Sequence, residues 1–159
     1  MEFLEFLQEA PIGDFIRTSD YGYPIVLCFH SLGMAVVVGV VFALNMRVLG
    51  FAKAIPPHMF KLLLTIAWWG FGANALSGVA LFMANGVNLV QNWTFILKII
   101  FIFLGGITTT VLWRSLQADP EMAGTEAVVT QKAKLYAAVS MVLWLGAIIW
   151  GRMIAYTLY

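Results

Sequence analysis

Residues 23–49 read YPIVLCFHSLGMAVVVGVVFALNMRVL, an apolar stretch around which the fold of the whole chain can be built. As a helix it is long enough to cross the hydrocarbon core of a bilayer, which is about 30 Å thick. His30 is the one side chain in its interior that can carry a charge near neutral pH. An imidazole inside lipid loses its water, so it is kept there only where it faces protein, a partner or a cofactor. His30 is therefore the first candidate for a functional residue.

The composition indicates an integral membrane protein. Of the 159 residues, 62% are hydrophobic and 11% are charged, and the mean hydropathy is +0.89. Soluble domains are about 45–50% apolar and about 25% charged. The net charge of +1 argues against a nucleic-acid footprint and against a polybasic lipid anchor. The single cysteine, Cys28, allows no internal disulfide.

The hydrophobic pattern predicts an all-α fold, an integral membrane four-helix bundle preceded by a short interfacial segment. Residues 1–22 form the predicted interfacial amphipathic segment, in which Pro11 and Gly13 separate two short pieces. Residues 23–159 form the four-transmembrane-helix domain. Its predicted spans cover about 24–49, 60–83, 93–112 and 134–158, and an uncharged loop is expected over 84–92.

Basic residues near the ends of the spans set the expected orientation. They gather beside the first and third connections, at Arg47, Lys53, Lys61, Arg114, Lys132 and Lys134. The segment before the first span instead holds five of the eight acidic residues and a single basic one, Arg17. By the positive-inside rule both termini face outward, which is the periplasmic side of a bacterial inner membrane.

Three basic groups are expected at one depth below the outer surface. Counted from the outer ends of their spans, His30, Lys98 and Arg152 each lie five or six residues inside. At 1.5 Å per residue this depth is about 7–9 Å. Ser77 falls at a similar level, and Asn74 lies one turn deeper. Four helices therefore direct polar groups at one layer of the bilayer.

The spans contain no carboxylate that could neutralise Lys98 and Arg152. An unpaired charge in the bilayer costs at least ~2.5–3.5 kcal/mol, so an anionic ligand is expected. Haem b meets this requirement, because its iron takes an axial imidazole from His30 and its propionates take basic partners. Gly33, one turn from His30, would let a porphyrin edge approach the backbone, and Met34 lines the same face.

A purely structural interpretation stands beside the haem hypothesis. His30 would then hydrogen-bond across the bundle to Asn74 or Ser77, and Lys98 and Arg152 would extend to the outer headgroups.

A second axial ligand is the main difficulty for haem. His58, the other histidine, is about 30 Å from His30 by helix rise and cannot bind the same iron within one subunit. The sixth ligand would be His30 of a neighbouring copy, or Met83 or Met153 at similar depth.

Several short motifs carry a resemblance to a known family. They are Tyr23-Pro24-Ile25, His30, Leu32-Gly33-Met34-Ala35 and Arg47-Val48-Leu49-Gly50, then Trp69-Gly70-Phe71, Ser77-Gly78, Leu81-Phe82, Asn92, Phe95 and Lys98. With them, residues 20–104 resemble a family of uncharacterised bacterial four-helix membrane proteins with a YPI-x4-H-x-LGMA motif, distantly similar to copper-resistance D and b-type cytochrome membrane domains. The resemblance implies the fold, the importance of His30 and Lys98, and a copper-transport alternative. The chain departs from the pattern at Asn45, where an acidic residue is expected before the arginine.

These features predict a membrane b-type haem-binding protein, an electron-transfer subunit that exchanges electrons with quinone or with an outer-side redox partner. A copper or small-solute transporter or channel is the first alternative, with His30 and Met34 as soft ligands on one helical face. A structural accessory subunit of a larger membrane complex is the second. Hydrolytic catalysis is not expected, because the spans hold no carboxylate and no nucleophile–base pair.

Small residues recur at helical spacing at Gly70, Asn74 and Gly78, and again at Ala147 and Gly151. Such stripes let helices approach one another closely. They exceed what one small bundle needs, so a homo-oligomer is expected.

Overall fold

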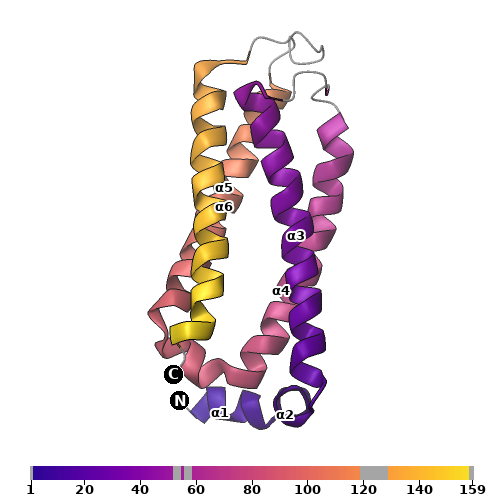
Figure 1. Ribbon diagram of the computed structural model, residues 1–159, viewed down its shortest axis with the longest axis vertical. Coiled ribbons are helices and arrows are strands. Elements are labelled where there is room, and N and C mark those ends of the chain that lie inside the picture. Colours follow the sequence, from indigo (N-terminus) through magenta and orange to yellow (C-terminus); the bar gives the residue numbers. More distant parts are fainter. Residues whose placement is uncertain (1, 52–54, 56–58, 119–128, 158–159) are drawn as a thin grey trace.

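Six helices make up the part of the chain that the computed structural model describes, which is residues 2–51, 55, 59–118 and 129–157. In chain order they are α1 (Glu2–Glu9), α2 (Pro11–Thr18), α3 (Gly22–Leu49), α4 (Phe60–Gln91), α5 (Trp93–Gln117) and α6 (Gln131–Thr157). The described residues contain no strand, so the predicted all-α fold is confirmed. Helices α3 to α6 are long and apolar enough to cross a membrane, and they run along the long axis of the molecule (Figure 1).

The predicted loop over 84–92 is wrong, because α4 continues to Gln91. The helix is broken at Asn85, which has non-helical dihedrals (φ −146°, ψ 32°), and it then resumes. Ala84, Gly86 and Leu89 in this last part are buried, and α1 and α2 pack against α4. The polar, uncharged residues of this segment indicate a loop, but tertiary packing stabilises it as a helix.

Both described ends of the chain lie at one end of the bundle, here called the terminal end, which carries α1, α2, Asn92 and Thr157 (Figure 1). The Asn92 side chain caps α5 by accepting hydrogen bonds from the Thr94 amide (2.9 Å) and hydroxyl (2.6 Å). It also donates to the Thr157 hydroxyl at 3.0 Å, which ties the start of α5 to the end of α6. At the opposite end, here called the loop end, α3 stops at Gly50, whose φ of 100° favours glycine.

The four long helices pack as two pairs, α3 with α4 and α5 with α6, joined mainly by contacts between α3 and α6. Small residues make the first pair close: a Cβ atom on Gly33 would lie 2.9 Å from the Gly70 carbonyl oxygen. A Cβ on Gly70 would lie equally close to Val36 Cγ1. In the second pair, a Cβ on Gly146 would overlap the Phe101 ring. Close helix contact within this chain therefore uses small residues that could otherwise be assigned to an oligomer interface.

Helices α1 and α2 lie across the terminal end of the bundle (Figure 1). Pro11 begins α2 rather than ending a helix, and Gly13 lies inside α2. A Cβ on Gly13 would lie 2.6 Å from the Leu7 carbonyl oxygen and 3.0 Å from that of Met83, so glycine lets α2 pack tightly on both α1 and α4. Phe3 remains 70% exposed. The two short helices thus form one packed unit with apolar side chains on its surface.

Two apolar clusters fill the interior between polar groups. The larger lies towards the loop end and includes Leu44, Phe60 and Leu112, all fully buried. A smaller cluster joins Val37 and Val41, about two and three turns after His30 on α3, to Trp144 on α6. Val37 and Val41 lie on α3 between the polar group around His30 and a deeper polar group, described below, to which Trp144 also belongs.

Candidate functional site

His30 is held on α4 by hydrogen bonds in both directions. Its Nδ1 atom lies 3.0 Å from the Asn74 carbonyl oxygen and 3.2 Å from Ser77 Oγ. The Asn74 side chain donates back to the His30 carbonyl oxygen at 2.6 Å. Gly78 lies beneath the ring, since a Cβ there would be 3.2 Å from His30 Cε1. The spacing of four residues that places Asn74 and Gly78 on one face of α4 therefore builds a platform for the imidazole.

Lys98 reaches the same imidazole from the other helix pair. Its Nζ atom lies 3.3 Å from His30 Nε2. The Lys98 stem runs over Gly151 of α6, where a Cβ would be 3.4 Å from both Cδ and Cε. This hydrogen bond connects α3 and α5, while α6 supplies the surface along which the lysine extends.

The chemistry of the two neighbours fixes the form of the imidazole. A carbonyl oxygen only accepts, so Nδ1 must donate its proton to Asn74. A lysine ammonium only donates, so Nε2 must present its lone pair to Lys98. His30 is therefore the neutral Nδ1–H tautomer with an accepting Nε2. Metal-bound histidines have the same arrangement, with one nitrogen donating to a carbonyl and the other binding the metal.

No acidic residue occurs in α3, α4, α5 or α6, so Lys98 has no carboxylate on the spanning helices. Among the described residues the one salt bridge joins Arg17 to Asp14 in α2, and both side chains are about half exposed. The layer around His30 therefore combines a cation with neutral hydrogen-bonding groups.

The structure brings together His30, Asn74, Ser77 and Lys98, as the depth count predicts. Arg152 lies outside this group. It is exposed, and its guanidinium carbon lies 5.6 Å from the centre of the Tyr156 ring. Because Gly151 faces Lys98, the next residue is turned about 100° away on the helix.

The other predicted site residues also differ in their surroundings. Gly33 packs against Gly70 and Asn74, so it serves contact between α3 and α4 rather than the approach of a porphyrin edge. Met34 is partly buried. His58 lies outside the described residues.

Sequence reasoning missed a second polar group deeper in the bundle. Asn45, Ser140, Thr109 and Trp144 form a continuous hydrogen-bonded chain across α3, α6 and α5. Counted from the outer ends of their spans, these residues lie at depths from about 21 to about 32 Å, so the depth comparison that identifies the His30 group does not indicate that they meet. The family pattern concerns Asn45 only as a neighbour of Arg47. In the structure the Asn45 side chain instead bonds to Ser140 on α6.

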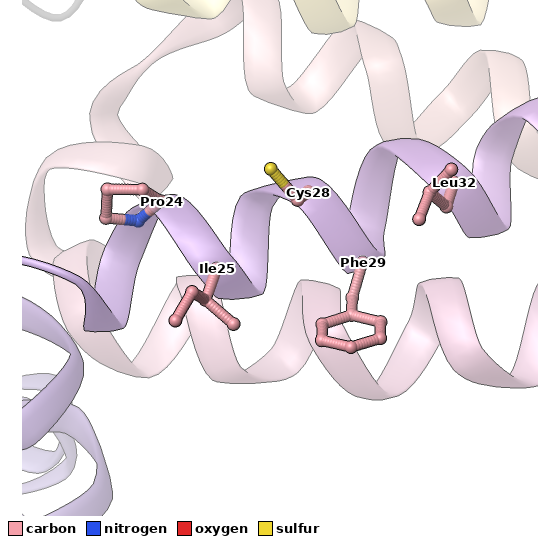
Figure 2. Close-up of a pocket in the computed structure, with 5 residues that line it drawn as sticks. All are labelled: Pro24, Ile25, Cys28, Phe29 and Leu32. Atoms are coloured by element: carbon pink, nitrogen blue, oxygen red, sulfur yellow. The ribbon is translucent and has the colours of Figure 1, made fainter.

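A shallow apolar pocket lies on α3, lined by Pro24, Ile25, Cys28, Phe29 and Leu32 (Figure 2). None of these residues belongs to the His30 group, and the lining has no polar surface. Cys28 is exposed there, so it does not pack inside the bundle.

The fold and its surface define a multi-pass α-helical membrane protein. Four spanning helices carry large exposed apolar side chains, for example Trp69 at 79% and Leu76 at 75%, which a bilayer would cover. Comparison with protein-family models, with curated proteins and with solved structures found no match. The described residues hold no cluster of three or more His, Cys, Asp or Glu side chains that could bind a metal ion.

Proposed function

We propose that this membrane protein binds a b-type haem through His30 and serves as an electron-transfer subunit. The observation that supports this proposal is the state of the imidazole. Its Nδ1 is anchored on the Asn74 carbonyl, so Nε2 is the nitrogen that can ligate iron. The Gly78 platform and Ser77 restrict the ring on the α4 side, which favours a fixed direction for Nε2.

The residues present fit one axial ligand, provided that Lys98 gives way. Lys98 Nζ lies on the Nε2 side of the ring, and its flexible stem lets the ammonium move to a carboxylate. Lys98 would then neutralise a propionate, and Arg152 would do the same after rotating away from Tyr156. The described residues bring no second imidazole to His30. Haem would supply one-electron chemistry at its iron.

The wider setting follows from the same proposal. Basic residues near the loop end, including Arg47 and Arg114, favour an orientation in a bacterial inner membrane with the terminal end on the periplasmic side. The His30 layer would then be about 7–9 Å below that surface, within reach of quinone or of an outer redox partner. A homo-oligomer would supply a second His30.

A structural role is the second candidate, as an accessory subunit of a larger membrane complex. The observation that favours it is that both nitrogens of the His30 ring already have partners within the chain. Such a bond between helix pairs stabilises a bundle without any ligand.

The absorption spectrum of protein purified from haem-replete cells separates the two candidates. The haem proposal predicts a Soret band that responds to reduction, is lost in His30→Ala and survives in His58→Ala. Lys98→Ala should shift the midpoint potential or loosen the haem without abolishing ligation, because Lys98 would neutralise a propionate and would not bind iron. A colourless preparation, or a Soret band indifferent to His30→Ala, supports the structural role instead.

A further inference from the structure

The deeper polar group, called here the Asn45 group, consists of Asn45, Ser140, Thr109 and Trp144. Asn45 Nδ2 donates to Ser140 Oγ at 3.2 Å, and Ser140 Oγ lies 3.1 Å from Thr109 Oγ1. Trp144 Nε1 also donates to Thr109 Oγ1, at 3.1 Å. Asn45 and Ser140 are fully buried. The group therefore lies in the interior, at the junction of α3, α5 and α6.

The hydrogen bonds in this group run in one direction. Thr109 Oγ1 donates to the Gly105 carbonyl oxygen at 2.8 Å, so the Thr109 oxygen is an acceptor for both Trp144 and Ser140. Ser140 then donates to Thr109 and accepts from Asn45. The donors of Ser140, Thr109 and Trp144 are all used in this way, so none of them is left for the oxygen of the Asn45 carboxamide.

That oxygen, Asn45 Oδ1, is buried and no described residue donates a hydrogen bond to it. If the carboxamide were turned by 180°, its nitrogen would instead be left without an acceptor. Burying a carbonyl oxygen without a donor is costly, and lipid supplies no donor. The unpaired oxygen therefore requires a small group that donates a hydrogen bond to it.

We propose that the Asn45 group binds a single buried water molecule, which donates to Asn45 Oδ1. Water is the smallest uncharged donor, and it serves this purpose at otherwise unpaired polar atoms inside proteins. On α6, Ala137 lies three residues before Ser140 and is also fully buried. On α3 the buried side chains of Val37 and Val41 lie between His30 and Asn45, so the inference does not depend on haem binding.

Transfer of magnetisation from water to asparagine side chains tests the proposal on the full-length protein in nanodiscs. With ¹⁵N-labelled asparagine, the Asn45 carboxamide protons should show a dipolar cross-peak to water with the sign of a long-lived contact. Asn92 is the matched control, since its carboxamide is also buried but bonded at both ends to Thr94 and Thr157. The Asn92 cross-peak should be absent or clearly weaker.

Ser140→Ala distinguishes bound water from proton exchange relayed through the Ser140 hydroxyl. The Asn45 cross-peak should persist in this variant, because the water contacts Oδ1 and not Ser140. Absence of the peak in the wild-type protein, or its loss in Ser140→Ala with the rest of the spectrum unchanged, overturns the proposal. A density map that shows ordered water gives a second reading: a peak about 2.8 Å from the outer end of the carboxamide is expected, and a dry contact there contradicts it.

Discussion

At the scale of single residues, depth along a helix is easier to predict than the direction in which a side chain points. The sequence predicts that His30, Asn74, Ser77 and Lys98 share a layer, because helix rise alone sets depth, and the structure brings them together. Rotation about the helix axis is harder to predict from one sequence. Arg152 is predicted at the depth of this group, but its position around the α6 axis directs it away from the group and towards Tyr156.

Gly33 offers a test of close packing at this scale. In Gly33→Ala the new methyl group would lie 2.9 Å from the Gly70 carbonyl oxygen, so α3 and α4 must separate. We expect a loss of about 1–3 kcal/mol in the free energy of unfolding, as for other overpacked contacts. Unfolding in mixed micelles with increasing SDS measures it.

Gly39→Ala on the same helix is the matched control, since a Cβ there would meet nothing within 4 Å. It should be neutral or stabilising by up to about 1 kcal/mol through helix propensity. Equal effects of the two substitutions would show that the contact between Gly33 and α4 is not close.

At the scale of elements, the four spans follow from apolar length, and all four are present. The end of α4 is the part that sequence reasoning misses. Residues 84–91 have no apolar periodicity long enough to indicate a helix, and their helical state depends on α1 and α2 packing against α4. Tertiary contacts of this kind are not visible in a local pattern.

The start of α5 gives a prediction about capping. Asn92→Ala removes the acceptor for the Thr94 amide and hydroxyl together with the bond to Thr157. We expect a loss of about 0.5–2 kcal/mol in unfolding free energy, which is the usual range for N-cap deletions. Asn88→Ala is the control, because Asn88 is exposed and bonds only within α4; a cost as large as that of Asn92→Ala would rule out a special role for the cap.

At the scale of the whole molecule, the described ends of the chain lie together at the terminal end (Figure 1), as an even number of spans requires. Direction across the membrane rests on the basic residues alone. Orientation is therefore a prediction that needs its own measurement.

Labelling of single cysteines in intact cells measures that orientation. In a Cys28→Ser background, cysteines replacing Glu5 and Asn88 at the terminal end should react with an impermeant maleimide once the outer membrane is opened. Cysteines replacing Gln117 and Gln131 at the loop end should react only after the inner membrane is permeabilised. All four native side chains are exposed. The reverse pattern contradicts the orientation, and different results for positions 5 and 88 contradict the topology.

Titration of the purified, haem-free protein with haemin examines the role of His30 with the fewest assumptions. Because Nδ1 is anchored on Asn74 and Nε2 accepts from Lys98, haemin should bind at Nε2. We expect a shifted Soret band that saturates at one haem per chain, or at one per two chains if two copies share an iron. His58→Ala should titrate like the wild type, and His30→Ala, with its helical content unchanged by circular dichroism, should show no specific shift. Identical titration curves for the wild type and His30→Ala, or no shift in either, would contradict haem binding at this site.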